Sequence, residues 1–154
     1  MIRVSHDHLI AKLKAAGIEP RGLGVWISSF LKNRKQRVCI RGSHSGWRTV
    51  WSGVLQCSVL DPVLFLLFVN DLLDNLQSSG KLLADDAKIY RSIRSSDDCS
   101  FLQKDLDSLQ VWSKTWLLNF DKEKCEVMHF GGKTLNYAYT RETTLATTKK
   151  EKDL

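Results

Sequence analysis

Hydrophobic residues recur along this chain at two different spacings, and the order of these spacings predicts the fold class. Apolar side chains at helical spacing, three or four residues apart, occur in residues 5–17, 20–31, 62–76 and 95–116. Stretches typical of strands occur in residues 36–42, 47–53, 81–83, 87–93 and 125–130. Strands joined by local hairpins, with helices packed on one side, predict an α+β fold.

Several of the predicted helices have recognisable ends. Gly17 can stop the first helix, and Pro20 can open the second. Ser95 and Asp98 have the spacing of a capping box at the start of the fourth. The third predicted helix, residues 62–76, begins with an almost uniformly apolar run. We therefore expect it to be mostly buried.

The first predicted hairpin is strongly basic. Its two β-rich stretches are separated by residues 43–45, which we expect to form the turn. No acidic residue lies between Glu19 and Asp61, whereas the same interval contains Arg21, Lys32, Arg34, Lys35, Arg37, Arg41 and Arg48. One interpretation is a solvated basic face, and the other is a surface that contacts nucleic-acid phosphates. The net charge of +6 suits a polyanionic partner without establishing one.

Composition limits the class of protein. With 154 residues, 43% of them hydrophobic and 26% charged, the chain suits one globular domain. The cysteines form no CxxC pair, which favours reduced thiols: they are Cys39, Cys57, Cys99 and Cys125. The first ten residues lack the apolar core of a signal peptide, and the apolar run at residues 63–69 is too short to span a membrane. We expect an intracellular protein, nuclear or cytoplasmic, that is not secreted and does not contact a membrane.

Two adjacent carboxylates, Asp85 and Asp86, stand between the strand-like stretches of the segment KLLADDAKIYRSI, residues 81–93. Like charges side by side at a hairpin tip have two interpretations. The pair belongs to a solvated turn, or it holds a divalent cation such as Mg²⁺, which prefers carboxylate and phosphate oxygens. An isolated ADD triplet is weak support for the second interpretation.

The neighbouring motifs favour the second interpretation. Upstream lies SGVLQCSVLDPVLFLLFVNDL, residues 52–72, and downstream lies WLLNFDKEKCEVMHF, residues 116–130. In this order, with ADD between them, the motifs resemble the reverse transcriptases of LINE-type non-LTR retrotransposons, in particular the jockey-like and chicken-repeat-like groups. The resemblance covers nearly the whole chain. It implies a reverse-transcriptase palm, an RNA template, a DNA primer and Mg²⁺.

The resemblance also implies roles for individual residues. Asp85 and Asp86 match the catalytic, metal-binding carboxylates of the palm hairpin, and Lys124 matches a lysine that assists proton transfer to the leaving pyrophosphate. The residues that match the nucleotide- and template-binding motif are Ser52, Gly53, Gln56 and Ser58. The basic residues expected to contact template or primer phosphates are Lys32, Arg34, Lys35, Arg37, Arg41 and Arg48.

The chain also departs from the family pattern. Residues 4–6, VSH, match the end of the family's AFDxVxH stretch, and Ile2 stands where that stretch has its second aspartate. The family's first catalytic aspartate would lie before Met1. Three further positions differ from the pattern: Cys57 replaces a glycine, Asp61 replaces the glycine before Pro62, and Leu83 replaces an aromatic residue.

On this resemblance we expect a palm-like fragment whose fingers and thumb are largely missing. Residues 1–130 would form a palm-like domain truncated at its N-terminus, and residues 131–154 a polar, Thr- and Lys-rich tail leading toward the thumb. Without the third carboxylate, we expect no catalysis by this chain alone. The alternatives are a nucleic-acid-binding remnant, or an interaction protein or translated pseudogene whose exposed apolar surface favours self-association.

Overall fold

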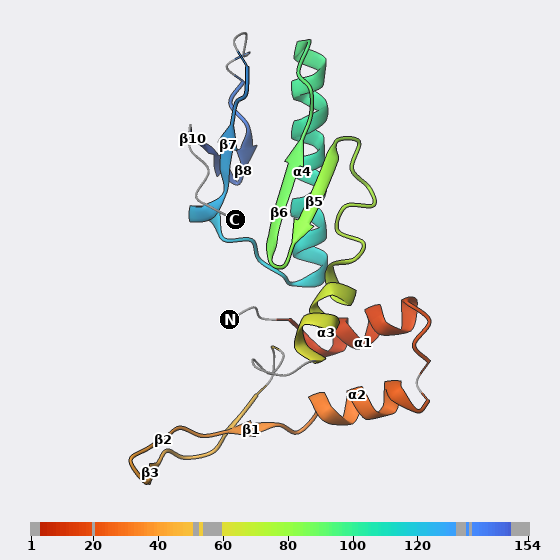
Figure 1. Cartoon of the computed structure of the whole chain (residues 1–154), viewed down its shortest axis with the longest axis vertical. Helices are drawn as coiled ribbons and strands as arrows, with labels where there is room; N and C mark the ends of the chain where they lie inside the picture. The colour runs from red at the N-terminus through yellow and green to blue at the C-terminus, as the bar shows by residue number, and fades with distance from the viewer. Residues whose placement is uncertain are drawn as a thin grey trace. The chain divides into compact units, whose positions relative to one another are not determined.

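The computed structural model describes residues 4–19, 21–50, 53, 60–131, 135 and 137–148 of the chain (Figure 1). They belong to two compact units. The first comprises Met1–Asn70 with Trp116–Leu118, and the second comprises Asp71–Thr115 with Asn119–Leu154. Within the described residues there are four α-helices and several short antiparallel hairpins, so the predicted α+β class is confirmed.

Three helices build the first unit: α1 (His6–Ala15), α2 (Leu23–Leu31) and α3 (Leu60–Val69). Helix α1 contacts both of the others. The apolar side chains buried in this unit are Val4, Leu9, Leu13, Ile27, Leu31, Leu64, Phe68 and Val69. Their burial supplies the main driving force for packing α1 against its two neighbours.

Helix α1 ends at the predicted glycine. Gly17 has a φ of 83°, a left-handed conformation that glycine adopts without a steric penalty. Its N–H donates to the carbonyl of Lys14 at 3.0 Å, and the N–H of Ile18 donates to the carbonyl of Leu13 at 2.9 Å. These two bonds form a Schellman motif, which satisfies the last carbonyls of the helix. Pro20, predicted to open α2, lies outside the described residues.

Trp116, the last residue of α4 (Ser96–Trp116), packs within the first unit. Its ring meets Phe68 edge-on at a centroid distance of 6.2 Å and His8 edge-on at 5.7 Å. The Lys12 ammonium, on a largely buried side chain, lies 3.8 Å from the centroid of the Trp116 ring. This cation–π contact favours placing a lysine charge against an aromatic cluster.

A two-stranded hairpin extends from the end of α2 (Figure 1). Its strands are β1 (Lys35–Gln36), β2 (Cys39–Ile40), β3 (Ser43–His44) and β4 (Arg48–Thr49). Strand β1 pairs antiparallel with β4, and β2 pairs antiparallel with β3. Gln36 lies opposite Arg48, whereas Cys39 lies opposite His44. The returning strand therefore holds one extra residue between the two pairs, which is a β-bulge.

The turn of this hairpin corrects the sequence prediction. We expected the turn at residues 43–45, but Ser43 pairs with Ile40, and the two-residue loop is Arg41–Gly42. Both loop residues have positive φ, 48° and 82° respectively. Two-residue hairpin loops with positive φ at both positions match the right-handed twist of the strands, and glycine favours this geometry.

The third helix is shorter than predicted. Helix α3 begins at Leu60 and ends at Val69, whereas we expected residues 62–76, and residues 71–75 form turns. Asparagine and aspartate follow Val69 directly, and their side chains compete with helical hydrogen bonding. The expectation that this helix is mostly buried is confirmed only in part, because Leu64, Phe68 and Val69 are buried, whereas Val63 is 49% exposed and Leu66 is 53% exposed.

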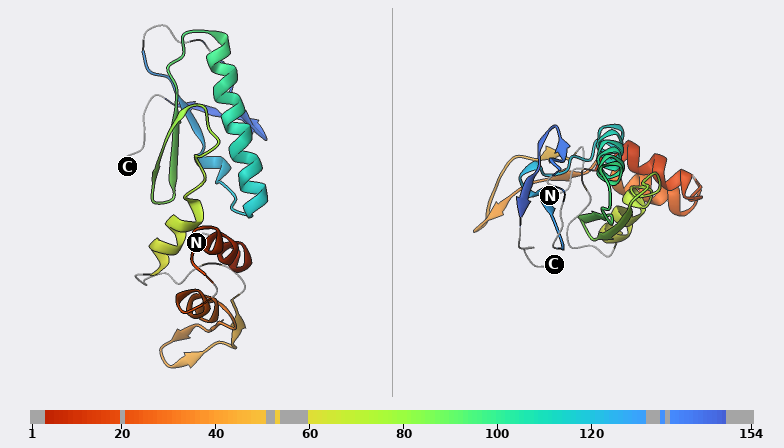
Figure 2. Two further views of the ribbon diagram at one scale, coloured as in Figure 1. Left: turned by 90° about the vertical axis from the view of Figure 1, so that its right-hand side faces the viewer. Right: turned by 90° about the horizontal axis from the view of Figure 1, so that it is seen from above.

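The second unit contains α4 up to Thr115 and a set of short strands. Its other elements are β5 (Ser79–Leu83), β6 (Asp86–Tyr90), the 3₁₀ turn η1 (Lys122–Lys124), β7 (Glu126–Met128), β8 (Thr140–Arg141), β9 (Thr143–Thr144) and β10 (Ala146–Thr148). The predicted hairpin of residues 81–93 is confirmed as the antiparallel pair β5–β6. Figures 1 and 2 show this hairpin lying along α4.

Beyond the predicted strand at residues 125–130, the sequence offered no clear pattern. The structure adds β8, β9 and β10 there, and β10 pairs in parallel with β7. The division into a domain of residues 1–130 and a tail of residues 131–154 stays a prediction. In the part of the chain that the structure describes, no helix is long and apolar enough to cross a membrane.

The two predicted capping residues meet at the start of α4. The carboxylate of Asp98 accepts hydrogen bonds from the backbone N–H groups of Arg94 and Ser95, at 3.0 and 3.1 Å. The Arg91 guanidinium also donates to this carboxylate at 3.2 Å. Asp98 thus satisfies N–H groups at the helix N-terminus, as the capping-box spacing predicts.

Buried Asp105 fixes the chain just before β5. It is 2% exposed, and its two carboxylate oxygens accept the backbone N–H groups of Gln77 and Ser78, each at 2.8 Å. A buried carboxylate needs such bonds, because its desolvation is otherwise costly. The chain at Gln77 and Ser78 is therefore anchored to α4 immediately before β5 begins at Ser79.

Candidate active site and nucleic-acid interface

The carboxylate pair lies at the tip of the β5–β6 hairpin. Strand β5 ends at Leu83, which pairs with Asp86, and residues Ala84 and Asp85 form the turn. Ala84 has a φ of 52°, in the left-handed region that favours glycine. Both carboxylates are exposed. The prediction that they lie at a strand–turn–strand tip, and not on a helix, is confirmed.

The register of the hairpin assigns a set of side chains to the face that Asp86 occupies. Paired residues project to the same side of a sheet, and the side alternates along each strand. Asp86 therefore shares its face with Leu83, with the opposed pair Lys81 and Lys88, and with Tyr90 at the end of β6. Tyr90 is 51% exposed. Lys81, Lys88 and Tyr90 were not among the site residues predicted from the sequence, although counting alternate residues in both directions from the hairpin tip would have found them.

The other face of the hairpin is apolar and less exposed. It carries Gly80, Leu82, Ala87 and Ile89, of which all but Ala87 are partly buried. A Cβ atom at Gly80 would lie 2.9 Å from the side chain of Leu73. This face packs inward, whereas Lys81, Asp85 and Asp86 are exposed and Lys88 is partly buried.

The chain contains a second adjacent pair of aspartates, Asp97 and Asp98, which serves as an internal comparison. Asp98 is engaged with the backbone and with Arg91, and the hydrogen bond from Arg94 is the main cause that lowers its pKa. Among the described residues, no hydrogen bond or ion pair engages the side chains of Asp85 and Asp86. Their carboxylate oxygens remain available to an external cation.

The pair at the hairpin tip fits Mg²⁺ in part. This ion commonly takes one or two protein carboxylates and completes its shell with water and substrate phosphates. No group of three or more acidic, histidine or cysteine side chains suited to a metal occurs in the part of the chain described. Asp85 and Asp86 therefore suit a weak site that substrate oxygens would complete.

Lys124 lies in η1 of the same unit. The turn is capped by Asp121, whose carboxylate accepts the N–H of Glu123 at 3.1 Å. Lys124 is exposed. Within the described residues, no ion pair or hydrogen bond joins its ammonium to Asp85 or Asp86. The structure therefore places Lys124 without bringing it into contact with the pair.

Gly53 is the one described residue of the predicted nucleotide-binding group. It is buried, with a φ of 87°, and its N–H donates to the carbonyl of Val4 at 2.9 Å. The His6 ring donates through Nε2 to the carbonyl of Gly53 at 2.9 Å. The segment matched to AFDxVxH and the start of the downstream motif are thus in direct contact. The other predicted positions, together with Cys57, lie outside the described residues: Ser52, Gln56 and Ser58.

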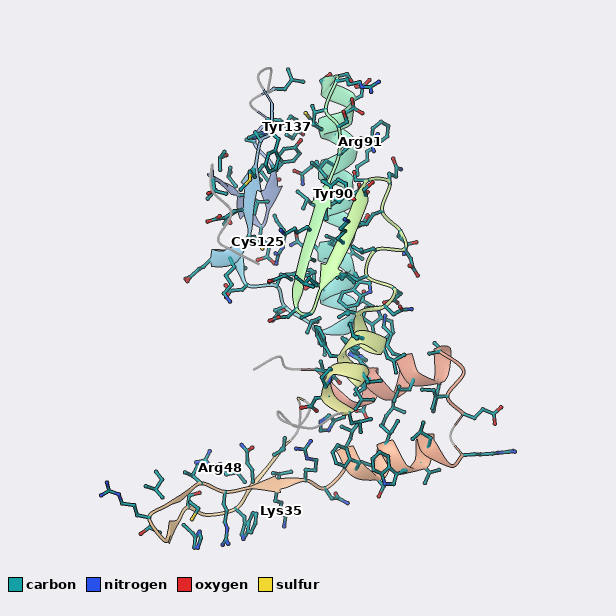
Figure 3. All side chains as sticks on the ribbon, in the orientation of Figure 1. Lys35, Arg48, Tyr90, Arg91, Cys125 and Tyr137 are labelled. Carbon is teal, nitrogen blue, oxygen red and sulfur yellow. The ribbon has the colours of Figure 1, made fainter. Side chains whose placement is uncertain are left out.

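The predicted phosphate-contacting residues surround the first hairpin but do not share one face. Lys35 and Arg48 belong to adjacent cross-strand pairs, so they project to opposite sides, as Figure 3 shows. Arg41 lies in the turn, and Lys32 follows the end of α2. The half-buried Arg34 places its guanidinium 5.5 Å from the centroid of the Phe30 ring. The hairpin is therefore basic on both sides.

The structure describes two of the positions that depart from the family pattern, Asp61 and Leu83. Asp61 lies in the first turn of α3, where the helix dipole favours a negative charge. Leu83 is 58% exposed beside the carboxylate pair. The first substitution thus has a local role in the helix, whereas nothing in the structure explains the second.

Comparisons with known proteins agree with the motifs. The family described as "Reverse transcriptase (RNA-dependent DNA polymerase)" matches residues 2–151. The "Probable RNA-directed DNA polymerase from transposon BS" of Drosophila melanogaster is 35% identical over 150 residues, which cover 92% of this chain and 15% of that protein. The "RNA-directed DNA polymerase from mobile element jockey" is 30% identical in Drosophila melanogaster, over 86% of this chain, and 31% identical in Drosophila funebris, over 83%. The chain again spans 15% of the length of each.

Proposed function

Because this chain belongs to the reverse transcriptase (RNA-dependent DNA polymerase) family, we propose that it supplies part of the site for template-directed nucleotidyl transfer on an RNA template and a DNA primer. The observation that carries the proposal is the position of Asp85 and Asp86. Both carboxylates are exposed at the tip of an antiparallel hairpin, and nothing in the described structure engages their side chains. An acidic tip of this kind suits a substrate-completed cation site.

Asp85 and Asp86 would hold Mg²⁺ together with phosphate oxygens of the incoming nucleotide. The ion would supply the positive charge that stabilises phosphoryl-type transfer. The chain's own contribution is to hold two negative charges at a fixed turn. The inward face of the hairpin, which includes Leu82 and Ile89, keeps that turn in place.

The exposed face of the same hairpin suits the nucleic acid. Exposed Lys81 lies on this face, where its ammonium would contact a phosphate of the nucleic-acid backbone. Tyr90, half exposed on the same face, adds an aromatic surface beside the lysines.

We further propose that these 154 residues alone do not catalyse the transfer. The family site uses a third carboxylate, and the described part of this chain brings no third acidic side chain into a group with Asp85 and Asp86. Loss of one carboxylate weakens the binding of both catalytic ions. The complete activity would then require residues supplied by a longer protein or by another chain.

Binding of Mn²⁺, a spectroscopic substitute for Mg²⁺, tests the proposed metal site. We expect Mn²⁺ to broaden the NMR signals of residues around the hairpin tip, and the double substitution D85N/D86N to abolish this broadening. The matched control is D97N, which alters the other aspartate pair. Equal broadening in the parent and in D85N/D86N would contradict the proposal.

Primer extension tests the catalytic part separately. The chain is incubated with an RNA template, a DNA primer, labelled deoxynucleotides and Mg²⁺. We expect no template-dependent incorporation. Incorporation that disappears in D85N would show that the third carboxylate is dispensable and would refute the statement that this chain is inactive alone.

A nucleic-acid-binding role without catalysis is the second candidate. It is favoured by the hairpin β1–β4, whose strands are fully exposed and whose surrounding residues 20–60 include no acidic side chain. Gel retardation of RNA at increasing salt tests it, because phosphate contacts make affinity fall steeply with salt concentration. Size-exclusion chromatography separates this role from self-association through exposed apolar side chains.

A further inference from the structure

Trp47 occupies an unusual position on the basic hairpin. It lies in the stretch between β3 and β4 and is 61% exposed. The Arg37 guanidinium lies 4.7 Å from the centroid of the Trp47 ring. Such a stacked pair covers part of one ring face and places a positive charge beside it, while most of the aromatic surface remains open to solvent.

The register of β1 and β4 creates this pairing, and the β-bulge follows it directly. Lys35 lies opposite Thr49 and Gln36 lies opposite Arg48, so the same register sets Arg37 opposite Trp47. The extra residue of the returning strand follows immediately toward the tip, because Ser45 is already bonded to Val38. Bulges redirect a side chain and increase the local twist. Trp47 is thus held by Arg37 at a bend in an otherwise regular ribbon.

Folding gives little reason for a tryptophan at this position. Trp112 in α4, by contrast, is 9% exposed, and its indole N–H donates to Asp71 at 3.0 Å. An aromatic ring stabilises a fold mainly through the area that it buries. Trp47 leaves most of that area in water, so a binding partner that covers the ring would account for its position.

The charge of the surroundings identifies the kind of partner. Residues 20–60 contain seven basic and no acidic side chains. A second copy of this hairpin would be repelled by the first, because both are positive. A nucleic-acid strand is attracted by the charge, and its unpaired bases stack on exposed aromatic rings.

We propose that Trp47, held by Arg37, is a stacking site for an unpaired base of single-stranded nucleic acid, with Lys35, which projects to the same side of the hairpin, contacting a flanking phosphate. In a duplex both faces of each base are already stacked, so this site distinguishes single strands from duplexes. The inference deepens the proposed function, because it names the form of nucleic acid that the basic hairpin binds. It requires neither the metal site nor catalysis.

Helix α2 carries a second arrangement of the same kind. The rings of Trp26 and Phe30 are stacked at a centroid distance of 5.6 Å and an interplanar angle of 17°, and Trp26 is 53% exposed. The Arg34 guanidinium lies over the Phe30 ring. An aromatic stack that ends in an exposed tryptophan, on the element that leads into the basic hairpin, extends the surface available to a strand.

Fluorescence anisotropy with labelled oligonucleotides tests the proposal on the full 154-residue chain. The probes are oligo(U) RNA, oligo(dT) DNA and a blunt duplex of the same length, each measured at several salt concentrations. We expect W47A to weaken single-strand binding about tenfold and to leave duplex binding unchanged. The two single-stranded probes show whether RNA or DNA is preferred.

Three further variants separate stacking from charge and from folding. W47F keeps an aromatic ring and should lose no more than about threefold in affinity. K35A should reduce the slope of log affinity against log salt by about 0.7, whereas W47A should leave that slope unchanged. I40A removes a side chain that is 65% exposed on the same hairpin but is not aromatic, and it should behave as the parent does.

The proposal is overturned if W47A binds single strands as the parent does, or if it weakens single-strand and duplex binding equally. It is also overturned if W47A converts a dimer into a monomer on size-exclusion chromatography, because Trp47 would then be a contact between copies. A negative primer-extension result leaves the proposal intact. A failure of W47A to affect binding leaves the metal site at Asp85 and Asp86 intact.

Discussion

The imidazole Nε2 of His6 donates a hydrogen bond to the carbonyl oxygen of Gly53 at 2.9 Å, across 47 positions of sequence. The N–H of the same glycine donates to the carbonyl of Val4, so both backbone groups of Gly53 are satisfied by the segment that leads into α1. This segment and Gly53 belong to two different motifs that resemble reverse transcriptases. The structure joins them directly, which explains why a histidine follows valine and serine at this position.

Replacing His6 tests this contact. H6A leaves the carbonyl of buried Gly53 without its side-chain donor, and we expect the free energy of unfolding to fall by about 1 kcal/mol. Urea denaturation followed by circular dichroism measures the change. H44A, which alters an exposed histidine of β3, should have almost no effect. Equal stabilities of H6A and H44A would contradict this role.

Replacing each of two alanines near the tip of the β5–β6 hairpin with glycine should change the free energy of unfolding in opposite directions. Ala84 has a φ of 52°, so A84G relieves steric strain and should raise the free energy of unfolding by up to about 1 kcal/mol. Ala87 lies in regular strand β6, so A87G should lower it by about 0.5–1 kcal/mol. Thermal unfolding of the two variants checks the signs, and a decrease in both would disprove the strain at Ala84.

Asp105 should be essential for the start of β5. D105N replaces one acceptor oxygen with an amide donor, which then faces a backbone N–H of Gln77 or Ser78. We expect a loss of about 2 kcal/mol in the free energy of unfolding, because a buried polar group is left unsatisfied. The control D107N changes an exposed aspartate of the same helix and should cost less than about 0.5 kcal/mol. Urea denaturation compares the two variants.

Asp98 makes the free energy of unfolding depend on pH in the acid range. Its pKa is lowered below the ordinary value of 3.8, chiefly by the hydrogen bond from the Arg94 N–H. A depressed pKa in the folded state stabilises the fold above pH 3.8, and this contribution is lost as the pH falls through the lower, folded-state value. D98N should unfold at a lower urea concentration than the parent protein. The difference between the two urea midpoints should be the same at pH 7 and pH 5 and should become smaller below pH 3.8. A deficit that stays constant in acid would contradict this origin.

Features decided by neighbouring residues were predictable from the sequence. The end of α1 at Gly17, the cap at Asp98 and the hairpin around Asp85 and Asp86 all lie where the pattern places them. Each depends mainly on contacts between residues that are close in sequence, and residue type largely determines such local geometry. The family resemblance likewise depends on the order of motifs, which needs no coordinates.

Some local features were nevertheless misjudged. The first turn was expected at residues 43–45, although Arg41–Gly42 provides the required backbone geometry. Helix α3 was expected to continue beyond Val69, because the apolar spacing continues there, whereas asparagine and aspartate follow the end of the helix. In both cases the side-chain pattern was compatible with two structures, and backbone conformational preference selected one.

What the sequence alone determined is the α+β order of elements, the acidic hairpin tip and the family. Only the tertiary structure decided that His6 holds Gly53, that Asp105 on α4 anchors the entrance to β5, and that β10 pairs in parallel with β7. The physical reason is sequence separation. Each of these contacts joins residues roughly 20 to 50 positions apart, and their formation depends on the burial and hydrogen bonding of the assembled unit, which no local pattern encodes.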